Sequence, residues 1–379
     1  MLELDSKAIF QLDSMLSAAS SIAVLTHTSP DGDAIGSTVA VASFLEELYP
    51  SSEISIIYDT LVPETLSFLL QEVSQDDDLS ARNRLKIAVA LSETLRARAL
   101  LDSADLVFCT DISGLSRCGS LCDAASSCKA PRVLVDHHLN PCAEEFSLMF
   151  SRTDISSSCE LLYWILKAMP GVGGDVQRIP SVARRALMTG MTTDTNNFAN
   201  SVFPSTLTMA SELIASGVDR DDILCHLLQS YRENRVRAFA HLLGERMVVR
   251  PEGYAYIIMN YAEWKNFGLR DGELEGLVNV PLSIREVRLS LFLREDEPPA
   301  EGEQTGGKFR VSIRSKRGVS ANRLAGSFFH GGGHEQASGG KLFYPGDIAG
   351  PTDAALYVDE SVREFLLSGT ENAKDDELK

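Results

Sequence analysis

The sequence of 379 residues lacks any long apolar run. Its apolar stretches, such as Val39 to Leu45, which Ser43 interrupts, fall well short of the ~18 residues that a membrane-spanning helix needs. The opening residues, Met1 to Asp5, carry no basic residue of the kind that begins a secretory signal. We therefore expect a globular, cytoplasmic protein that has no membrane partner.

Cysteine is too sparse for a disulfide scaffold. The seven cysteines are an odd number in a long chain, which is typical of reduced thiols. Cys118, Cys122 and Cys128 lie close together in the sequence, but their spacing fits no zinc finger. We expect ordinary buried or surface thiols at these positions.

Positive charge is also scarce, because 35 Lys and Arg residues face 53 Asp and Glu residues, for a net charge of −18. Proteins that bind long nucleic acid rely on a basic surface, so this charge opposes a long duplex as partner and favours small or short substrates. The exception is the segment from Lys308 to Arg323, which has basic residues and no acidic one. On charge count alone, it is either a local anion-binding patch or a solvated strand face.

The first half of the chain alternates short β-branched runs with helical patterns, which is typical of a parallel sheet in an α/β protein. From Val248 the pattern changes to period two, as in Val287 to Leu293 and Phe309 to Ile313, which predicts a sheet with one exposed face. The predicted strands of the first half are Ile22 to Thr26, Ile54 to Tyr58, Leu106 to Thr110 and Arg132 to Val135.

Length and these patterns together predict an α/β protein of two domains. We expect a first domain over residues 1–204, a helical linker over 205–247 and a smaller α/β domain over 248–368. The charged tail, 369–379, is expected to be disordered.

Acidic residues and histidines follow the predicted strands. His27, Asp31 and Asp33 come after the first strand, Asp111 after the third, and the triplet Asp136-His137-His138 ends the fourth. Ligands gather at the carboxyl ends of parallel strands, so these groups are expected to converge on one edge of the sheet. A helical stretch near residues 181–189 then leads into the segment Gly190 to Thr195, which adds Asp194.

Mixed imidazole and carboxylate ligands suit Mn²⁺, Fe²⁺, Co²⁺ or Zn²⁺, whereas Mg²⁺ prefers oxygen alone. Four carboxylates at one strand edge, those of Asp31, Asp33, Asp111 and Asp194, would repel one another unless cations or protons neutralise them. Two divalent ions would balance them and could activate water for attack on a phosphate. Taken singly, each Asp after a strand could instead be a helix cap. His137 and His138 point to opposite sides if the strand continues, so they cannot serve one metal equally.

A run of three glycines, Gly331-Gly332-Gly333, stands between His330 and His334. Such a run is either a flexible turn or a loop whose backbone N–H groups cradle an anion. Because it follows the basic segment and a predicted helix over residues 321–329, we favour the anion cradle.

These motifs, in this order, resemble the DHH phosphoesterase family, in which a DHH domain is joined to a DHH-associated domain that ends in a GGGH loop. The form of the motifs, His27-Thr-Ser-Pro-Asp-Gly-Asp and Thr193-Asp-Thr-Asn-Asn197, is similar to the bacterial nanoRNase and pAp phosphatase branch. The resemblance spans about residues 22–340. His330 departs from the family pattern, because a further glycine is common at this position.

The resemblance implies a residue for each role. One metal ion would be held by His27, Asp31 and Asp111, and the other by Asp33, Asp111, His137 and Asp194, with Asp111 as the bridge. His138 would contact the scissile phosphate, and Asp136 would fix the imidazoles. The nucleotide would be held in the cleft between the domains by Arg314, Ser315, Asn322, the three glycines at 331–333 and His334.

We therefore expect a hydrolase that uses two divalent metal ions, most simply Mn²⁺. It would cleave short RNA oligonucleotides to mononucleotides and dephosphorylate 3′-phosphoadenosine 5′-phosphate. The alternatives are linear or cyclic dinucleotide cleavage, RecJ-type single-strand exonuclease action, pyrophosphate hydrolysis and a nucleotide sensor without catalysis. The sequence leaves a homodimer open.

Overall fold

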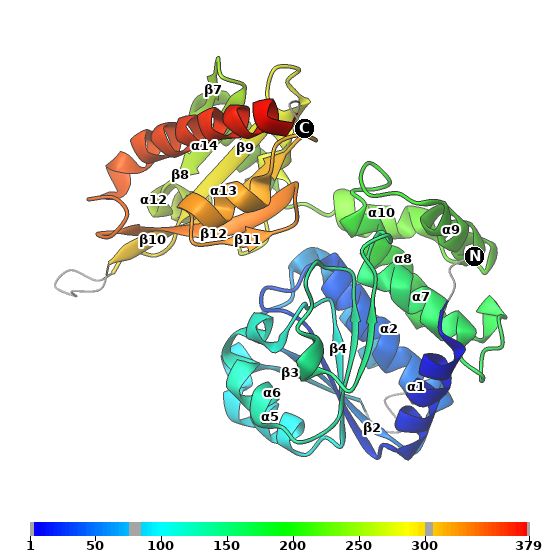
Figure 1. Cartoon of the computed structure of the whole chain (residues 1–379). Coiled ribbons are helices and arrows are strands. Elements are labelled where there is room, and N and C mark those ends of the chain that lie inside the picture. The colour runs from blue at the N-terminus through cyan, green and yellow to red at the C-terminus, as the bar shows by residue number, and fades with distance from the viewer. Residues whose placement is uncertain (1–3, 76–84, 300–305, 377–379) are drawn as a thin grey trace. The chain divides into compact units, whose positions relative to one another are not determined.

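The computed structural model describes residues 4–75, 85–299 and 306–376, with side chains up to residue 367. The chain divides into two compact units, Met1–Ser230 and Tyr231–Lys379 (Figure 1). The division falls inside the segment that the sequence predicts as a helical linker. Each unit is described by itself below.

The first unit contains a parallel sheet with the strand order β3-β2-β1-β4-β5-β6, as the fold prediction requires. The order reverses between β1 and β4, which makes the carboxyl ends of these two strands the expected ligand-binding position. The four predicted strands are present, whereas β3 and β6 were not predicted. The strands are β1 (Ser21–Leu25), β2 (Glu53–Tyr58), β3 (Leu85–Val89), β4 (Leu106–Thr110), β5 (Arg132–Asp136) and β6 (Leu148–Ser151).

Helices cover both faces of this sheet (Figure 1). Alternate residues of β1 pack into different cores: Ile22 and Val24 face α2, α7 and α8, while Ala23 and Leu25 face α5 and α6. The helices are α1 (Ser6–Ala18), α2 (Gly32–Leu48), α3 (Ser67–Gln75), α5 (Ala90–Asp102), α6 (Cys122–Ser127), α7 (Ser158–Ala168), α8 (Ser181–Asp194), α9 (Pro204–Ala215) and α10 (Arg220–Leu228), with short turns η1 (Glu64–Leu66), η2 (Leu115–Leu121), η3 (Ala143–Glu145) and η4 (Val176–Arg178).

The helix α2 lies so close to α8 that Gly36 has no room for a side chain. A Cβ atom at this position would stand 2.6 Å from the backbone oxygen of Ala186 and 3.0 Å from Cys159 Sγ. We expect Gly36→Ala to lower the free energy of unfolding by about 1–3 kcal/mol, because the helices must separate. Urea denaturation in the presence of EDTA measures this. Gly244→Ala is the control, since nothing lies within 4 Å of its added Cβ. Equal stability of the two variants would show that α2 and α8 adjust without cost.

The second unit contains a mixed sheet with the order β11-β12-β10-β9-β8-β7, in which β8 and β9 are parallel and the other pairs antiparallel. Buried and partly exposed residues alternate along β10, as period two predicts, but β9 is buried on both faces. The reason is a second apolar cluster behind β9, which includes Phe292 and Leu277. The strands are β7 (Met247–Arg250), β8 (Tyr254–Met259), β9 (Leu289–Glu295), β10 (Gly307–Ser315), β11 (Gly332–Gly333) and β12 (Ala337–Tyr344).

The helices α13 and α14 cover one face of this sheet, where Leu324 and Val358 pack against the strands. The helix α14 continues into the tail that the sequence predicts as disordered, and residues 377–379 lie outside the described part of the chain. In the described part of the chain, no helix is both long and apolar enough to cross a bilayer. The helices are α11 (Glu233–His241), η5 (Leu242–Arg246), α12 (Tyr261–Asn266), η6 (Leu277–Ser283), α13 (Ala321–Phe328), η7 (Pro351–Asp353) and α14 (Ala354–Asp376).

Candidate metal centre

The loop after β1 and the first turn of α2 place three predicted ligands, His27, Asp31 and Asp33, at the reversal point of the sheet. Asp31 caps α2, since its Oδ1 accepts hydrogen bonds of 3.1 Å from the backbone N–H groups of Asp33 and Ala34. Helix capping and metal binding are therefore compatible at this residue. Gly32 is required in this loop, because a Cβ atom would stand 2.2 Å from Thr193 Oγ1.

The imidazole of His27 is buried and its orientation is fixed. Nδ1 lies 2.8 Å from the carbonyl oxygen of Thr28, and because a carbonyl only accepts, Nδ1 carries the proton. Nε2 then faces the carboxylates of Asp111, at 3.3 Å, and Asp31, at 3.8 Å. Burial lowers the pKa of His27, but these two carboxylates outweigh burial and raise the pKa to about 10.

Asp111 lies at the centre of the cluster. Its carboxylate is 3.3 Å from His27, 3.7 Å from His137 and 3.6 Å from His138, and Oδ1 accepts a 3.1 Å hydrogen bond from Ser158 Oγ. Burial would raise the pKa of Asp111, but the hydrogen bond and charge of His27 hold the pKa well below its usual range. The backbone of Asp111 is left-handed, with φ 59°, which Asp and Asn tolerate better than most residues.

Asp33 is buried and held by the N-terminus of α7. The backbone N–H groups of Ser158 and Cys159 donate to its two oxygens at 2.7 and 2.9 Å. Unpaired N–H groups and the helix dipole favour a carboxylate at this position. Burial and the charges of Asp111 and Asp31 nevertheless raise the pKa of Asp33 well above its usual range. Ser158 and Cys159 were not predicted from the sequence, in which the only signal was a helix start after the Ser156-Ser157 pair.

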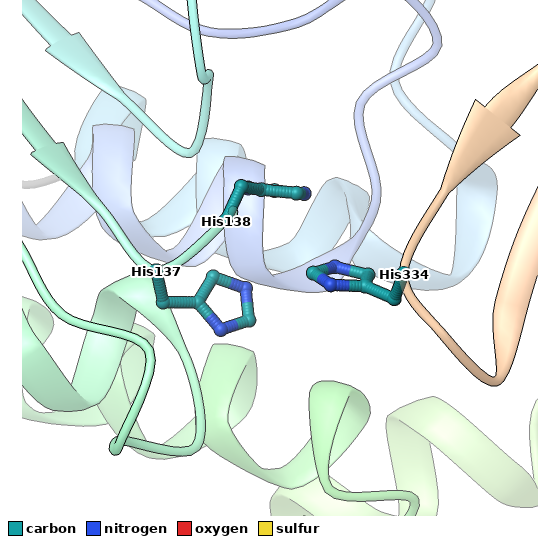
Figure 2. Close-up of side chains that lie close together, drawn as sticks. All are labelled: His137, His138 and His334. Atoms are coloured by element: carbon teal, nitrogen blue, oxygen red, sulfur yellow. The ribbon is translucent and has the colours of Figure 1, made fainter. Parts of the chain in front are cut away.

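The two histidines of the triplet both lie close to Asp111 Oδ1, at 3.7 and 3.6 Å, but differ in their other partners. β5 ends at Asp136, so the alternation expected of a strand that continues through both histidines does not apply. Figure 2 shows their side chains, whose ring centroids are 4.9 Å apart and whose planes make an angle of 65°. His138 Nδ1 lies 2.7 Å from Asp136 Oδ1, so Asp136 sets the tautomer and directs Nε2 away. His137 Nε2 faces Asp33 at 3.9 Å, Asp111 at 3.7 Å and Asp194 at 3.6 Å.

Asp194 is the last residue of α8, so the helix predicted near residues 181–189 continues for five further residues. At Gly190 the helix packs tightly against Asp33 and Cys159. A Cβ atom added to Gly190 would stand 2.3 Å from Cys159 Sγ, so only glycine fits here. The chain then turns through left-handed residues at Asn196, Asn197 and Phe198. The end of the helix thereby delivers the Asp194 carboxylate to His137.

This arrangement fits divalent cations. Ligand atoms of His27, Asp31 and Asp111 lie within 4.8 Å of one another, and those of Asp33, Asp111 and His137 form a second such group that shares Asp111. Asp111 also forms a third such group with Asp136 and His138. Burial lowers the pKa of His137, which keeps its imidazole neutral and able to bind a metal ion. Carboxylates buried beside one another, with Asp33 driven to hold a proton, are the donor set that cations neutralise.

Metal binding should release protons, because the metal-free cluster holds one on His27 and favours one on Asp33. A proton on His27 competes with the metal ion below a pKa of about 10, so affinity should rise with pH. For each proton displaced, we expect the Kd for Mn²⁺ to fall about tenfold per pH unit around neutrality. Calorimetric titration in buffers of different protonation enthalpy counts the protons. His27→Gln should release about one proton fewer. An affinity that does not change with pH would contradict the protonation of His27 and Asp33 in the metal-free cluster.

In the second unit, close contacts with neighbouring backbone require glycine at two positions of the loop Gly331–Gly333. A Cβ on Gly331 would stand 1.9 Å from the backbone oxygen of Gly339, and Gly333 has φ 143°. His330, which replaces a glycine common in the family, adopts φ 47°. Its Nε2 lies 2.8 Å from Asp347 Oδ1, and this contact supports the left-handed backbone.

The predicted nucleotide-binding residues lie around this loop. Asn322, on α13, donates its side-chain amide to the backbone oxygen of Gly333, and His334, labelled in Figure 2, follows β11. Arg314 Nη1 donates to the backbone oxygen of Ile313 at 2.9 Å. Ser315 is buried and donates to Val319, so its predicted contact with a substrate stays a prediction.

Much of the basic segment is paired within the unit. Asp296 Oδ1 lies 2.8 Å from Arg310 Nε, and Asp296 Oδ2 lies 3.7 Å from Lys308 Nζ. Lys316 Nζ donates to the backbone oxygens of Ile284 and Arg285. Part of the predicted patch is therefore a set of structural ion pairs and hydrogen bonds.

Together, the parallel sheet, the cluster around Asp111 and the glycine loop define a phosphoesterase of the DHH type. The chain belongs to the DHH family: residues 21–191 match the N-terminal domain of the DHH family, and residues 254–350 match the DHHA1 domain.

Its relatives span nearly the whole chain. A protein of Streptococcus mutans, named probable bifunctional oligoribonuclease and PAP phosphatase NrnA, is 25% identical over 335 residues, 86% of this chain and 91% of the relative. The bifunctional oligoribonuclease and PAP phosphatase NrnA of Thermus thermophilus is 26% identical over 324 residues, 85% of this chain and 84% of the relative. The crystal structure of an exopolyphosphatase-related protein from Bacteroides fragilis is 29% identical, with a TM-score of 0.83 over 98% of this chain and all of that one.

Proposed function

We propose that this protein is a cytoplasmic, Mn²⁺-dependent phosphoesterase that degrades short oligoribonucleotides to mononucleotides and removes the 3′-phosphate of 3′-phosphoadenosine 5′-phosphate. The observation that carries the proposal is the carboxylate of Asp111 at the reversal point of the sheet, which the candidate ligand groups of both proposed metal sites share. Relatives named for both activities support the choice of substrates.

In this proposal, His27, Asp31 and Asp111 hold one divalent ion. Asp33, Asp111, His137 and Asp194 hold the other. Such a pair of ions supplies Lewis-acid activation of the phosphate and of the attacking water. The mixture of imidazole and carboxylate donors favours Mn²⁺ over Mg²⁺.

His138 is proposed to donate a hydrogen bond to the scissile phosphate. Its Nδ1 lies 2.7 Å from Asp136 Oδ1, and this contact orients the imidazole ring. An imidazole N–H held in place in this way can donate to the charge that develops on a phosphate. Asp136 therefore acts through His138 and does not itself touch the substrate.

The second domain is proposed to bind the part of the nucleotide away from the scissile bond. Arg314, His334 and the glycine loop Gly331–Gly333 are proposed to contact a terminal phosphate and a sugar. The backbone N–H of Gly331 donates to the oxygen of Ala325 at 3.1 Å, so this glycine is proposed to act by allowing close approach. Asn322 is proposed to contact the nucleotide while it ties α13 to this loop. A nucleotide can make such contacts through its sugar and its terminal phosphate, whereas a bare phosphate cannot make them all.

A substrate panel tests the proposal. It contains 3′-phosphoadenosine 5′-phosphate, linear and cyclic dinucleotides, single-stranded RNAs of about two to ten nucleotides, and pyrophosphate, each with Mn²⁺ and with Mg²⁺ after chelation. We expect the highest kcat/KM with the shortest RNAs, clear activity on 3′-phosphoadenosine 5′-phosphate and a strong preference for Mn²⁺. Preference for pyrophosphate or for cyclic dinucleotides would replace the proposed substrates, and absence of any turnover would favour a sensor.

The role of the second domain gives a separate prediction. Arg314→Ala and His334→Ala should each lower kcat/KM for dinucleotides about ten- to a hundredfold, the effect of losing one charge-assisted hydrogen bond of ~1.5–3 kcal/mol. A small diester, bis(p-nitrophenyl) phosphate, should lose much less, because it lacks the remote groups. Metal content is checked in both variants. Equal losses on both substrates would place these residues at the chemical step or in folding instead.

A further inference from the structure

Asp59 is a buried carboxylate that belongs to none of the candidate metal-ligand groups found in the described part of the chain. It follows β2 and accepts three hydrogen bonds. Thr28 Oγ1 donates at 2.6 Å, and Ser120 donates from its backbone nitrogen at 2.9 Å and from its hydroxyl at 2.5 Å. A carboxylate that meets only donors acts purely as an acceptor, and an amide or a methyl group could not replace it in full.

The chain makes room for this carboxylate at Gly119. This residue has φ 62°, and a Cβ atom added to it would stand 2.1 Å from Asp59 Oδ2. A side chain at position 119 is thus disfavoured by both backbone and contact. Gly119 lies in η2, in the segment that runs on from Asp111 after β4.

Thr28 joins Asp59 to the metal centre. Its hydroxyl donates to Asp59, its backbone N–H donates to the oxygen of Arg117 at 2.8 Å, and its backbone oxygen accepts the Nδ1 proton of His27 at 2.8 Å. The contacts of its hydroxyl and its N–H therefore hold Thr28 in place, and its carbonyl oxygen orients the His27 imidazole. Asp59 at once holds the loop of His27 and the loop that follows Asp111.

We propose that Asp59 is a positioning residue: through Thr28 it fixes the tautomer and orientation of His27, and so sets the affinity of the metal site formed by His27, Asp31 and Asp111. The inference rests on the proposed metal centre. It assigns no such role for the site of His137 and Asp194, whose ligands are held by α7 and α8.

A matched pair of variants tests this. Thr28→Val removes the hydroxyl that Asp59 accepts, and Thr28→Ser keeps it. Asp59→Ala removes the acceptor itself. Thr94→Val is the control, because this exposed residue also loses one hydroxyl hydrogen bond, to Ala90 at 2.7 Å, away from the site. Mn²⁺ binding to chelator-treated full-length protein is followed by calorimetry and electron paramagnetic resonance, which resolve two affinities without any turnover.

We expect Thr28→Val and Asp59→Ala to weaken one of the two Mn²⁺ sites about tenfold or more, as changes behind a metal-binding histidine do, and to leave the other unchanged. Thr28→Ser and Thr94→Val should bind Mn²⁺ like the wild type. If Thr28→Val binds both ions normally, or loses both equally while folded, the proposal is wrong, whatever happens to Asp59→Ala. If the wild type itself binds no Mn²⁺, the proposed metal centre fails first.

Discussion

Asp111→Asn is expected to lower kcat/KM about a thousandfold or more and to reduce the occupancy of both metal ions. A neutral amide would replace the carboxylate that both proposed metal sites share. Loss of a Lewis-acid contribution of several kcal/mol lowers the rate by about a thousandfold or more. Asn is the informative replacement because it tolerates the left-handed backbone at this position. Loss of activity then reflects the charge and not the fold. Activity and metal content are measured on the same preparation.

Asp154→Asn is the matched control, since its side chain is 60% exposed and forms its ion pair with Arg152, away from the metal centre. It should keep full metal content and turnover. Two metal ions and near-normal turnover in Asp111→Asn would remove Asp111 from the bridging role.

His138→Gln is expected to give the second largest effect, a fall in kcat of about a hundred- to a thousandfold, with both metal ions retained. This is the loss that follows removal of one donor aimed at developing charge. Asp136→Asn should lose less, because it changes the hydrogen bond at Nδ1 and leaves the imidazole in place. Metal analysis, circular dichroism and single-turnover rates on a dinucleotide separate these effects.

The control for His138→Gln is His226→Gln, an exposed histidine on α10 that should show no change in turnover. If His138→Gln also loses a metal ion, His138 is a ligand and not a phosphate contact. If turnover is unchanged, the role assigned to His138 must be abandoned.

Much of the fold could be predicted from the sequence because its strands are rich in β-branched residues and end in polar residues. The two strands that were missed are weak by the same criteria: β3 is an edge strand with Lys86 near its start, and β6 has only four residues. The sequence gives little support for the extension of α8 over Gly190–Asp194, because Gly and Thr are poor helix formers. Packing of Gly190 against α7 and Asp33 overrides that preference.

The proposed ligand positions stand out in the sequence because histidine and paired aspartates after strands are uncommon together. The groups that hold them do not. Ser158, Cys159 and Asp59 are residue types that occur everywhere, and they come from segments far away in the sequence. Only the folded chain brings them to Asp33 and Thr28. The pKa of Asp33 is raised and the pKa of Asp111 is lowered, and both shifts likewise depend on burial and on distances in the folded chain. They make the cluster suited to binding cations.

The central claim is that Asp111 bridges two divalent ions. Anomalous diffraction at the manganese edge from crystals grown with Mn²⁺ tests it most directly. We predict two peaks about 3.5–4 Å apart, on either side of the Asp111 carboxylate. His27 and Asp31 should be at one peak, and Asp33, His137 and Asp194 at the other. A single peak, or two peaks of which one does not contact Asp111, would contradict this claim.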